Sequence, residues 1–164
     1  MNTKFLEQIA SMSPEDLYKA IYCDQMTGVL NRKAFDDNSA DHAGAVAVID
    51  LDSLKYLNDT LGHRTGDAFL CGLAEALGTE FTEVYRLSGD EFALLGSNGL
   101  EFARKLEQVR QAFPSFSYGI GSTVEEADVK LRADKAFRER CGLRASRGEC
   151  PPWVAEVEKL VATK

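Results

Sequence analysis

Two acidic clusters contain the residues of this sequence that are best suited to chemistry. Asp90 and Glu91 lie between two apolar runs, in a segment whose turn residues are typical of a β-hairpin. Asp50 and Asp52 follow another apolar run about forty residues upstream. Acidic residues rarely end a buried strand unless a cation lies beside them. If the fold brings the clusters together, they form an oxygen-lined site suited to Mg²⁺ (or Mn²⁺) and a phosphate substrate.

The elements that must position these acids follow a pattern of short apolar runs and amphipathic segments. The predicted core order is β-α-α-β-β-α-β-α, assigned to residues 45–49, 53–61, 66–78, 81–87, 92–95, 98–113, 115–120 and 125–140. Further helices are expected in the first forty residues, one of them after Ser13-Pro14, and at 152–161. We therefore predict an α+β fold, ferredoxin-like or polymerase-palm-like, with a mainly antiparallel sheet flanked by helices. In this topology the strand that ends at Asp50 can lie beside the hairpin.

The composition is typical of a single globular domain, because 45% of the 164 residues are hydrophobic and 27% are charged. The expected organisation is an N-terminal helical extension (1–22), a core domain (23–150) and a C-terminal helix that packs on the domain or extends from it (151–164). An apolar stripe within residues 5–21 is short, and we favour its packing on the domain over its forming a dimerising helix.

The formal net charge of −7 argues against binding to nucleic acid or to anionic membranes. No apolar stretch has the length of a membrane span, and the N-terminus lacks the apolar core of a signal peptide. We therefore expect a cytoplasmic protein. Its four cysteines show no zinc-site spacing and are expected to be reduced thiols.

Several separated motifs together resemble those of GGDEF domains, the family of diguanylate cyclases. The similar segments are residues 24–32 (DQMTGVLNR), 50–59 (DLDSLKYLND), 61–67 (LGHRTGD), 88–92 (SGDEF), 116–121 (FSYGIG) and 133–134 (AD). The resemblance implies that two GTP molecules are condensed into cyclic di-GMP, with one GTP presented by each subunit of a transient homodimer. The 3′-hydroxyl of one GTP would attack the α-phosphate of the other and release pyrophosphate.

The same resemblance implies a role for each matching residue. Asp50, the backbone carbonyl of Leu51 and Asp90 would hold Mg²⁺, and Asp90 would also help to deprotonate the 3′-hydroxyl. Glu91 and Lys55 are assigned to the catalytic set, with Lys55 contacting phosphate. The residues assigned to substrate binding are Asn58 and Asp67 on the guanine edge, His63, Arg140 and Arg144.

Each assignment has a simpler structural alternative. Asp50 could stabilise the dipole of the following helix, Asp67 could cap a helix, and Lys55 could be an ordinary surface residue. The motif also departs from the family at Ser88, which replaces the first glycine. If that position required a positive φ, a serine there would cost about 1 kcal/mol.

The family's C-terminal basic pair aligns with Cys141 and Ala145, although a shift of one residue would place Arg140 and Arg144 at the same spacing. The family's product-inhibition motif, R-x-x-D, would fall on residues 79–82 (TEFT) and is absent there. These departures leave two alternatives to a cyclase. One is a degenerate GGDEF domain that binds GTP or cyclic di-GMP as a regulatory module, and the other is a palm-like domain that acts on another nucleoside triphosphate. Asn58 and Asp67 argue against the latter.

Overall fold

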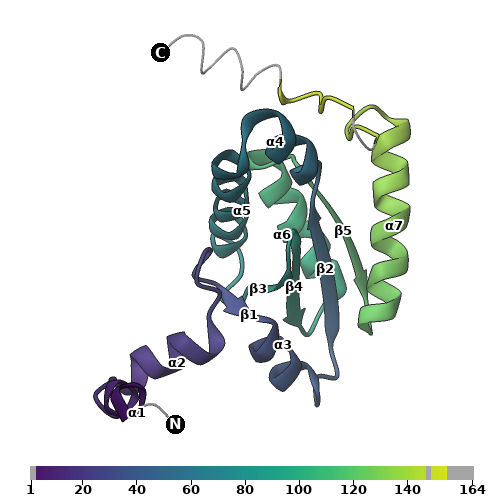
Figure 1. The fold of residues 1–164 in the computed structure, drawn as a ribbon. Helices are drawn as coiled ribbons and strands as arrows, with labels where there is room; N and C mark the ends of the chain where they lie inside the picture. Colours follow the sequence, from purple (N-terminus) through teal and green to yellow (C-terminus); the bar gives the residue numbers. More distant parts are fainter. Residues whose placement is uncertain (1–2, 147–148, 155–164) are drawn as a thin grey trace.

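The computed structural model describes residues 3–146 and 149–154 and contains a five-stranded sheet of order β1-β3-β4-β2-β5 (Figure 1). The central strand β2 (Ala45–Leu51) is antiparallel to both β4 (Glu91–Gly96) and β5 (Phe116–Gly121). Strand β3 (Tyr85–Ser88) is antiparallel to β4 and parallel to the short β1 (Leu30–Asn31). The predicted α+β fold with a mainly antiparallel sheet is therefore confirmed.

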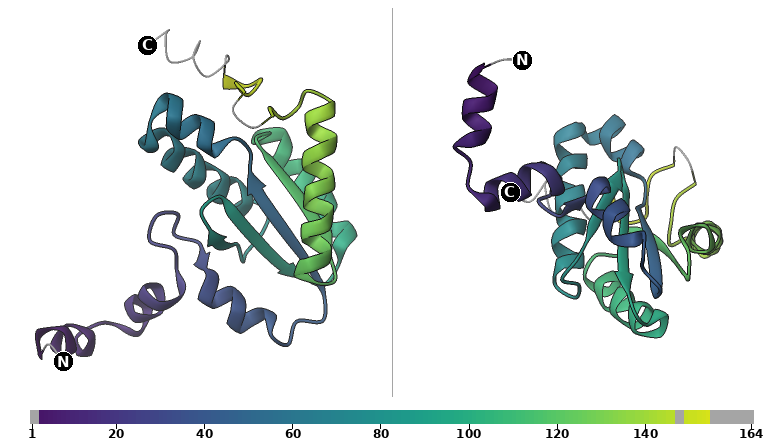
Figure 2. Two further views of the ribbon diagram at one scale, coloured as in Figure 1. Left: turned by 45° about the vertical axis from the view of Figure 1, so that its right-hand side comes forward. Right: turned by 90° about the horizontal axis from the view of Figure 1, so that it is seen from below.

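Helices cover both faces of this sheet (Figure 2). One layer contains α5 (His63–Gly78) and α6 (Gly99–Ala112), whose apolar side chains pack against Ala45, Ala47, Ile49 and Leu51 of β2. The other layer contains α3 (Arg32–Ser39) and α7 (Val124–Arg140), which pack against Val46 and Val48. Since side chains alternate along a strand, Asp50 belongs to the face that α7 covers.

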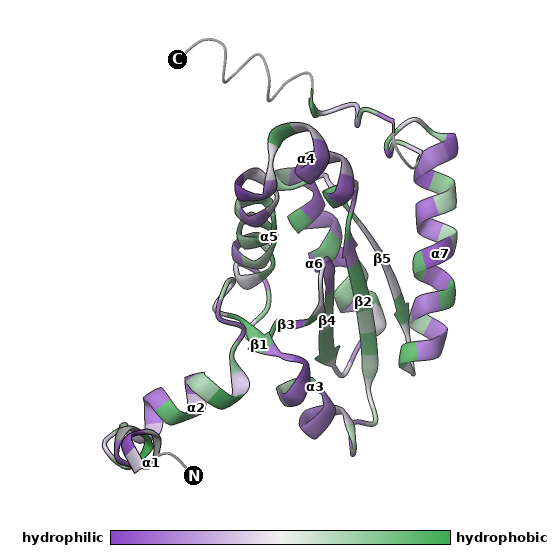
Figure 3. Ribbon diagram, viewed as in Figure 1, coloured by the Kyte–Doolittle hydropathy of each residue, from purple (hydrophilic) through white to green (hydrophobic). Residues whose placement is uncertain are grey.

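Burial of β2 on both faces explains its sequence. All seven of its residues are buried, and the run AVAVI gives both faces apolar side chains. In Figure 3 the hydrophobic colour follows β2 and β4, whereas α7 is mixed along its length because only one side of it meets the sheet. Asp50 lies near the end of the buried strand, and Asp52 follows directly after the strand, just before α4 (Leu54–Leu61).

The N-terminal helices α1 (Thr3–Ala10) and α2 (Pro14–Tyr22) project away from the sheet (Figures 1 and 2). Helix α2 begins after Ser13, whose hydroxyl accepts a hydrogen bond from the Asp16 amide, as the sequence predicted. It has no buried residue, and Leu17, Tyr18 and Ile21 are exposed, so the expected packing of this part of the apolar stripe on the domain was wrong. None of the helices in the described part of the chain is long and apolar enough to cross a membrane.

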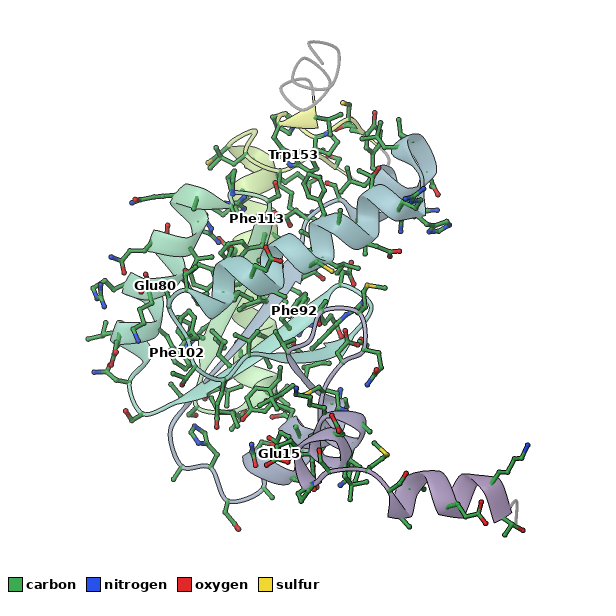
Figure 4. The ribbon with its side chains drawn as sticks, turned by 90° about the vertical axis from the view of Figure 1, so that its left-hand side faces the viewer. Glu15, Glu80, Phe92, Phe102, Phe113 and Trp153 are labelled. Atoms are coloured by element: carbon green, nitrogen blue, oxygen red, sulfur yellow. The ribbon has the colours of Figure 1, made fainter. Side chains whose placement is uncertain are left out.

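At the other end of the described chain, Trp153 stacks on Phe69 of α5 with ring centroids 4.9 Å apart. Phe69 also contacts Phe113, and Figure 4 shows Trp153 and Phe113 at this end of the α5 layer. Pro151 and Val154 are buried, so residues 151–154 are part of the packed structure. The helix predicted for 152–161 lies mostly outside the described residues.

Some predicted boundaries were wrong. The strand expected at 81–87 begins only at Tyr85, because Phe81 and Val84 are core residues in irregular backbone. The helix expected to begin near Gly66 begins at His63, and the N-terminal region expected to be helical contains the strand β1. Apolar residues that pack from a loop have no periodicity that distinguishes them from a strand.

Candidate active site

A cleft of about 590 Å³ opens where β2 ends, between the first turn of α4, the β3–β4 hairpin and the chain around and beyond the end of α7. Five residues assigned to the site from the sequence line it: Asp50, Leu51, Lys55, Asp90 and Arg144. Figure 1 shows the segment beyond α7 (yellow) running past α4 at this end of the sheet. We call residues 141–146 and 149 the C-terminal arm, and its Arg144, Ala145, Ser146 and Glu149 form one wall of the cleft.

The sheet brings the two acidic clusters together. Asp50 lies opposite Glu91 in the antiparallel pairing of β2 with β4. Beyond this pair, the Leu51 amide donates a hydrogen bond to the Asp90 carbonyl at 3.0 Å. The prediction that the first strand and the hairpin are sheet neighbours is therefore confirmed.

The Asp50 carboxylate lies in an environment that disfavours its charge. Asp50 is only 9% exposed, and this burial raises the pKa of its carboxyl group to about 6. The nearby acids Asp90 and Asp52 add to this rise, whereas Lys135, whose Nζ lies 2.7 Å from Asp50 Oδ2, opposes it. A bound cation would relieve the same unfavourable charge.

The raised pKa of Asp50 implies that the stability of the folded protein depends on pH. A raised pKa in the folded state gives stability that is present below about pH 4 and is lost as the pH rises through about 6. In metal-free buffer, the free energy of unfolding of Asp50→Asn should therefore rise relative to that of wild type by about 1–3 kcal/mol when the pH is changed from 4 to 7.5. Urea unfolding in EDTA at both pH values measures this gain, with the exposed Asp41→Asn as the control. Parallel pH profiles for wild type and Asp50→Asn would contradict the prediction.

The donor atoms at the end of β2 suit a hard divalent cation. Among the described residues, no group of three or more His, Cys, Asp or Glu side chains is arranged to hold a metal ion. Asp50, Leu51 and Asp90 nevertheless all line the cleft, and residues of these types can offer two carboxylates and a backbone carbonyl. Mg²⁺ commonly binds through one or two carboxylates and completes its coordination with water and substrate phosphate. The residues present therefore fit Mg²⁺ or Mn²⁺ bound together with a nucleotide.

The first turn of α4 gives the cleft a second feature suited to phosphate. The preceding residue, Ser53, has a left-handed backbone with φ of 64°, and its side chain makes no cap hydrogen bond to the helix. Ser53, Leu54 and Lys55 all line the cleft. The amides at the start of a helix and its dipole favour anions, so this turn can receive a phosphate group.

Lys55 lies at the outer side of this turn. Its Nζ pairs with Asp59 at 2.8 Å, and its side chain is 75% exposed. Exposed pairs of this kind are weak, so the ammonium can leave Asp59 for a phosphate at little cost.

A buried ionic network that the sequence did not reveal joins the end of β2 to the C-terminal arm. Asp52 Oδ1 accepts hydrogen bonds from Arg144 Nε at 2.7 Å and from Ser117 Oγ at 2.8 Å. Asp52 Oδ2 lies 3.5 Å from Arg138 Nη2, an ionic contact without hydrogen-bond geometry. Asp52 is 2% exposed and Arg138 5%. Arg144, assigned to substrate binding from the sequence, thus lines the cleft while it is held by Asp52.

The other residues assigned from the sequence lie outside the lining of the cleft. Asn58 Oδ1 is buried against Gly66, where an added Cβ would collide with it, and has no hydrogen-bond partner in the described structure. Asp67, the residue after Gly66, is exposed, as are His63 and Arg140. The Asn58 and Gly66 contact brings the second and third motifs of the resemblance together across α4 and α5.

The serine in the signature hairpin fits its position. Ser88 belongs to β3, and among the described residues Ser53 is the one non-glycine with a positive φ. The left-handed residue of the hairpin is instead Gly89, with φ of 41°. Ser88 Oγ donates a hydrogen bond to the exposed carboxylate of Glu91 at 2.8 Å. The backbone strain that a serine would suffer at a positive φ is therefore absent here.

Comparisons with known proteins agree with these motifs. The family model described as "Diguanylate cyclase, GGDEF domain" matches residues 21–130. The chain is 39% identical over 156 residues to the diguanylate cyclase DgcP of Escherichia coli K12, covering 73% of this chain and 46% of DgcP. It is 32% identical over 138 residues to the diguanylate cyclase VdcA of Vibrio cholerae, and this match covers 79% of this chain and 37% of VdcA. The chain therefore spans less than half the length of these two relatives.

A solved structure shows the same architecture. The crystal structure of the GGDEF domain of DgcB from Caulobacter crescentus, in complex with c-di-GMP, matches with a TM-score of 0.66. The two chains are 28% identical, and the match covers 71% of this chain and 91% of that one.

Proposed function

Because the chain belongs to the GGDEF family of diguanylate cyclases, we propose that it condenses two GTP molecules into cyclic di-GMP, with each subunit of a transient homodimer supplying half of the active site. The observation that carries this proposal is the meeting of Asp50 and Asp90 beside the first turn of α4. Carboxylates, a helix N-terminus and an accessible lysine are the groups that a nucleoside triphosphate requires. The proposal places the protein in the cytoplasm.

In this proposal Asp50, the Leu51 carbonyl and Asp90 would hold Mg²⁺ or Mn²⁺. The bound ions would supply charge stabilisation at the attacking and leaving oxygens. The α4 amides and Lys55 would orient the triphosphate, and Arg140 and Arg144 would lie at its outer end. Asp90 would accept the proton of the 3′-hydroxyl, with Glu91 beside it in the hairpin.

Base recognition would use Asn58, Asp67 and His63. A guanine edge carries the N1 and N2 donors, and a carboxylate or an amide oxygen accepts from them, whereas adenine would leave such acceptors unpaired. The contact of Asn58 with Gly66 supports this assignment, because it places Asn58 beside the residue that precedes Asp67.

We therefore expect GTP to bind more tightly than ATP in the presence of Mg²⁺, by about tenfold or more. Asp67→Ala should remove most of this preference. Calorimetric titration of both nucleotides into wild type and Asp67→Ala measures it, and Glu75→Ala on the exposed side of the same helix is the control. Equal affinities of wild type for the two nucleotides would refute the guanine assignment.

One observation favours a second candidate, a GGDEF domain that binds nucleotide without turnover. Arg144 is engaged by Asp52, and Cys141 and Ala145 occupy the positions of the family's basic pair. The triphosphate would then be held more weakly. Incubation with GTP and Mg²⁺, followed by chromatography for cyclic di-GMP, separates the two functions. Turnover that rises more than linearly with protein concentration supports the cyclase with two half-sites. GTP binding without product at any concentration supports the binding module.

A further inference from the structure

Lys135 is the cation that the structure places on the proposed metal ligand Asp50. The distance from Lys135 Nζ to Asp50 Oδ2 is 2.7 Å, and the two side chains are 26% and 12% exposed. Both residues line the cleft. The ammonium therefore occupies one of the two carboxylate oxygens through which a divalent cation could bind, because both cations bind through the oxygen lone pairs.

The packing of α7 fixes Lys135 at this level of the sheet. Leu131, one turn earlier, packs in the same layer as Val46 and Val48 of β2, and Asp50 continues that face of the strand. Asp134 accepts hydrogen bonds from the Tyr118 amide at 3.0 Å and from Arg110 Nη2 at 2.7 Å. Arg138 Nη2 donates to the Pro114 carbonyl at 2.7 Å. With the helix held on both sides of residue 135, the ammonium can leave Asp50 by rotation of its own side chain.

The charges around Asp50 explain why a cation is held there. Asp90 and Asp52 lie close enough to disfavour the Asp50 charge, and Asp52 is already engaged by Arg144 and Arg138. Lys135 offsets the charge of Asp50 in the protein without ligand. When a divalent cation approaches, the same ammonium opposes it, since like charges a few ångströms apart in a partly buried cleft repel strongly.

We propose that Lys135 is a positioning residue that occupies the cation position of Asp50 in the free protein and turns to the substrate phosphates when metal and nucleotide bind. This inference rests on the proposed function, which assigns Asp50 to the metal. Its consequence is order in binding: metal alone binds weakly, whereas metal that arrives with a triphosphate gives the displaced ammonium a new anionic partner. Lys135 would thus couple metal binding to nucleotide binding.

The test measures Mn²⁺ binding by electron paramagnetic resonance in the absence of nucleotide. Lys135→Met should bind Mn²⁺ about tenfold more tightly than wild type, because a competing positive charge is removed. With Mg²⁺ present, the same variant should bind a non-hydrolysable GTP analogue several-fold more weakly. Tighter metal binding together with weaker nucleotide binding would indicate that Lys135 moves from Asp50 to the phosphates, whereas a merely structural role would weaken the binding of both.

Lys130→Met is the matched control on the same helix. Lys130 Nζ donates to the Ile120 carbonyl at 2.7 Å and lies outside the cleft, so its loss should leave Mn²⁺ affinity unchanged. Lys135→Gln is the second variant, and it keeps an uncharged polar side chain, one atom shorter than lysine, if the methionine variant does not fold. Unchanged or weaker Mn²⁺ binding in the folded Lys135 variants overturns the inference.

Asp90→Asn separates this outcome from failure of the proposed function. If Asp90→Asn weakens Mn²⁺ binding while the Lys135 variants do not strengthen it, the metal site stands and the role of Lys135 is wrong. If Asp90→Asn leaves Mn²⁺ binding unchanged, the assignment of the metal to this cleft is wrong and the inference falls with it.

Discussion

Replacement of Asp90 by asparagine should reduce the formation of cyclic di-GMP by about a thousandfold or more while leaving the fold intact. The hairpin contact to β2 uses the Asp90 backbone carbonyl, so a change of side chain does not remove it. The side chain is only partly buried, and the amide has the same size. What is lost is a negative oxygen that would hold the metal and accept the proton of the 3′-hydroxyl.

The measurement is product formation from GTP and Mg²⁺, with thermal unfolding recorded on the same samples. Asp41→Asn, an exposed acid in the loop before β2, is the control and should retain full activity. An Asp90→Asn variant that makes cyclic di-GMP at the wild-type rate would exclude Asp90 from the mechanism. A variant that loses its cooperative thermal transition would instead assign Asp90 a structural role.

The parts of the fold that local patterns specify were predicted from the sequence. The run AVAVI indicated β2, and Asn98 marked the start of α6, where its side chain accepts hydrogen bonds from the Leu100 and Glu101 amides. Turn residues marked the hairpin. These signals act over a few residues, because strand periodicity, capping and turn chemistry are local properties of the chain.

The predicted order of helices and strands made it possible to predict that the strand ending at Asp50 lies beside the hairpin, but not what surrounds Asp50. The Asp52 hydrogen bonds reach residues 65 and 92 positions away, Ser117 and Arg144. Lys135 likewise meets Asp50 only because α7 crosses back over β2. No local pattern distinguishes Arg144 and Lys135 from the exposed arginines and lysines near them in the chain. Their roles depend on the helix rotation and on the alternation of β2, which are set by packing.

The face of β2 that carries Asp50 links these observations. Val46, Val48 and Asp50 alternate toward α3 and α7, and Asp52 lies two residues further along the chain. The same helix therefore presents Lys135 to the first acid and Arg138 to the second. Asp50 keeps access to the cleft, whereas Asp52 is enclosed. Two acids that look equivalent in the sequence thus have different environments, one suited to a ligand and one to structure.

Replacement of the enclosed acid should therefore have the largest effect on stability. Asp52→Ala should lower the free energy of unfolding by about 3–5 kcal/mol, because it leaves Arg138 buried without its opposite charge. Burial, with Arg110 nearby, already lowers the pKa of the Arg138 guanidinium. The variant would also release Arg144 and with it the C-terminal arm that forms one wall of the cleft.

Urea unfolding of Asp52→Ala and Asp36→Ala measures this difference. Asp36 forms an ion pair of similar length with Arg32 on α3, but the two side chains are 57% and 60% exposed, so its loss should cost about 0.5 kcal/mol or less. The double variant Asp52→Ala, Arg138→Met should recover part of the lost stability, because it removes the uncompensated charge as well as its partner. If Asp52→Ala proves as stable as Asp36→Ala, the network does not hold the arm. The position of Arg144 at the cleft would then require another cause.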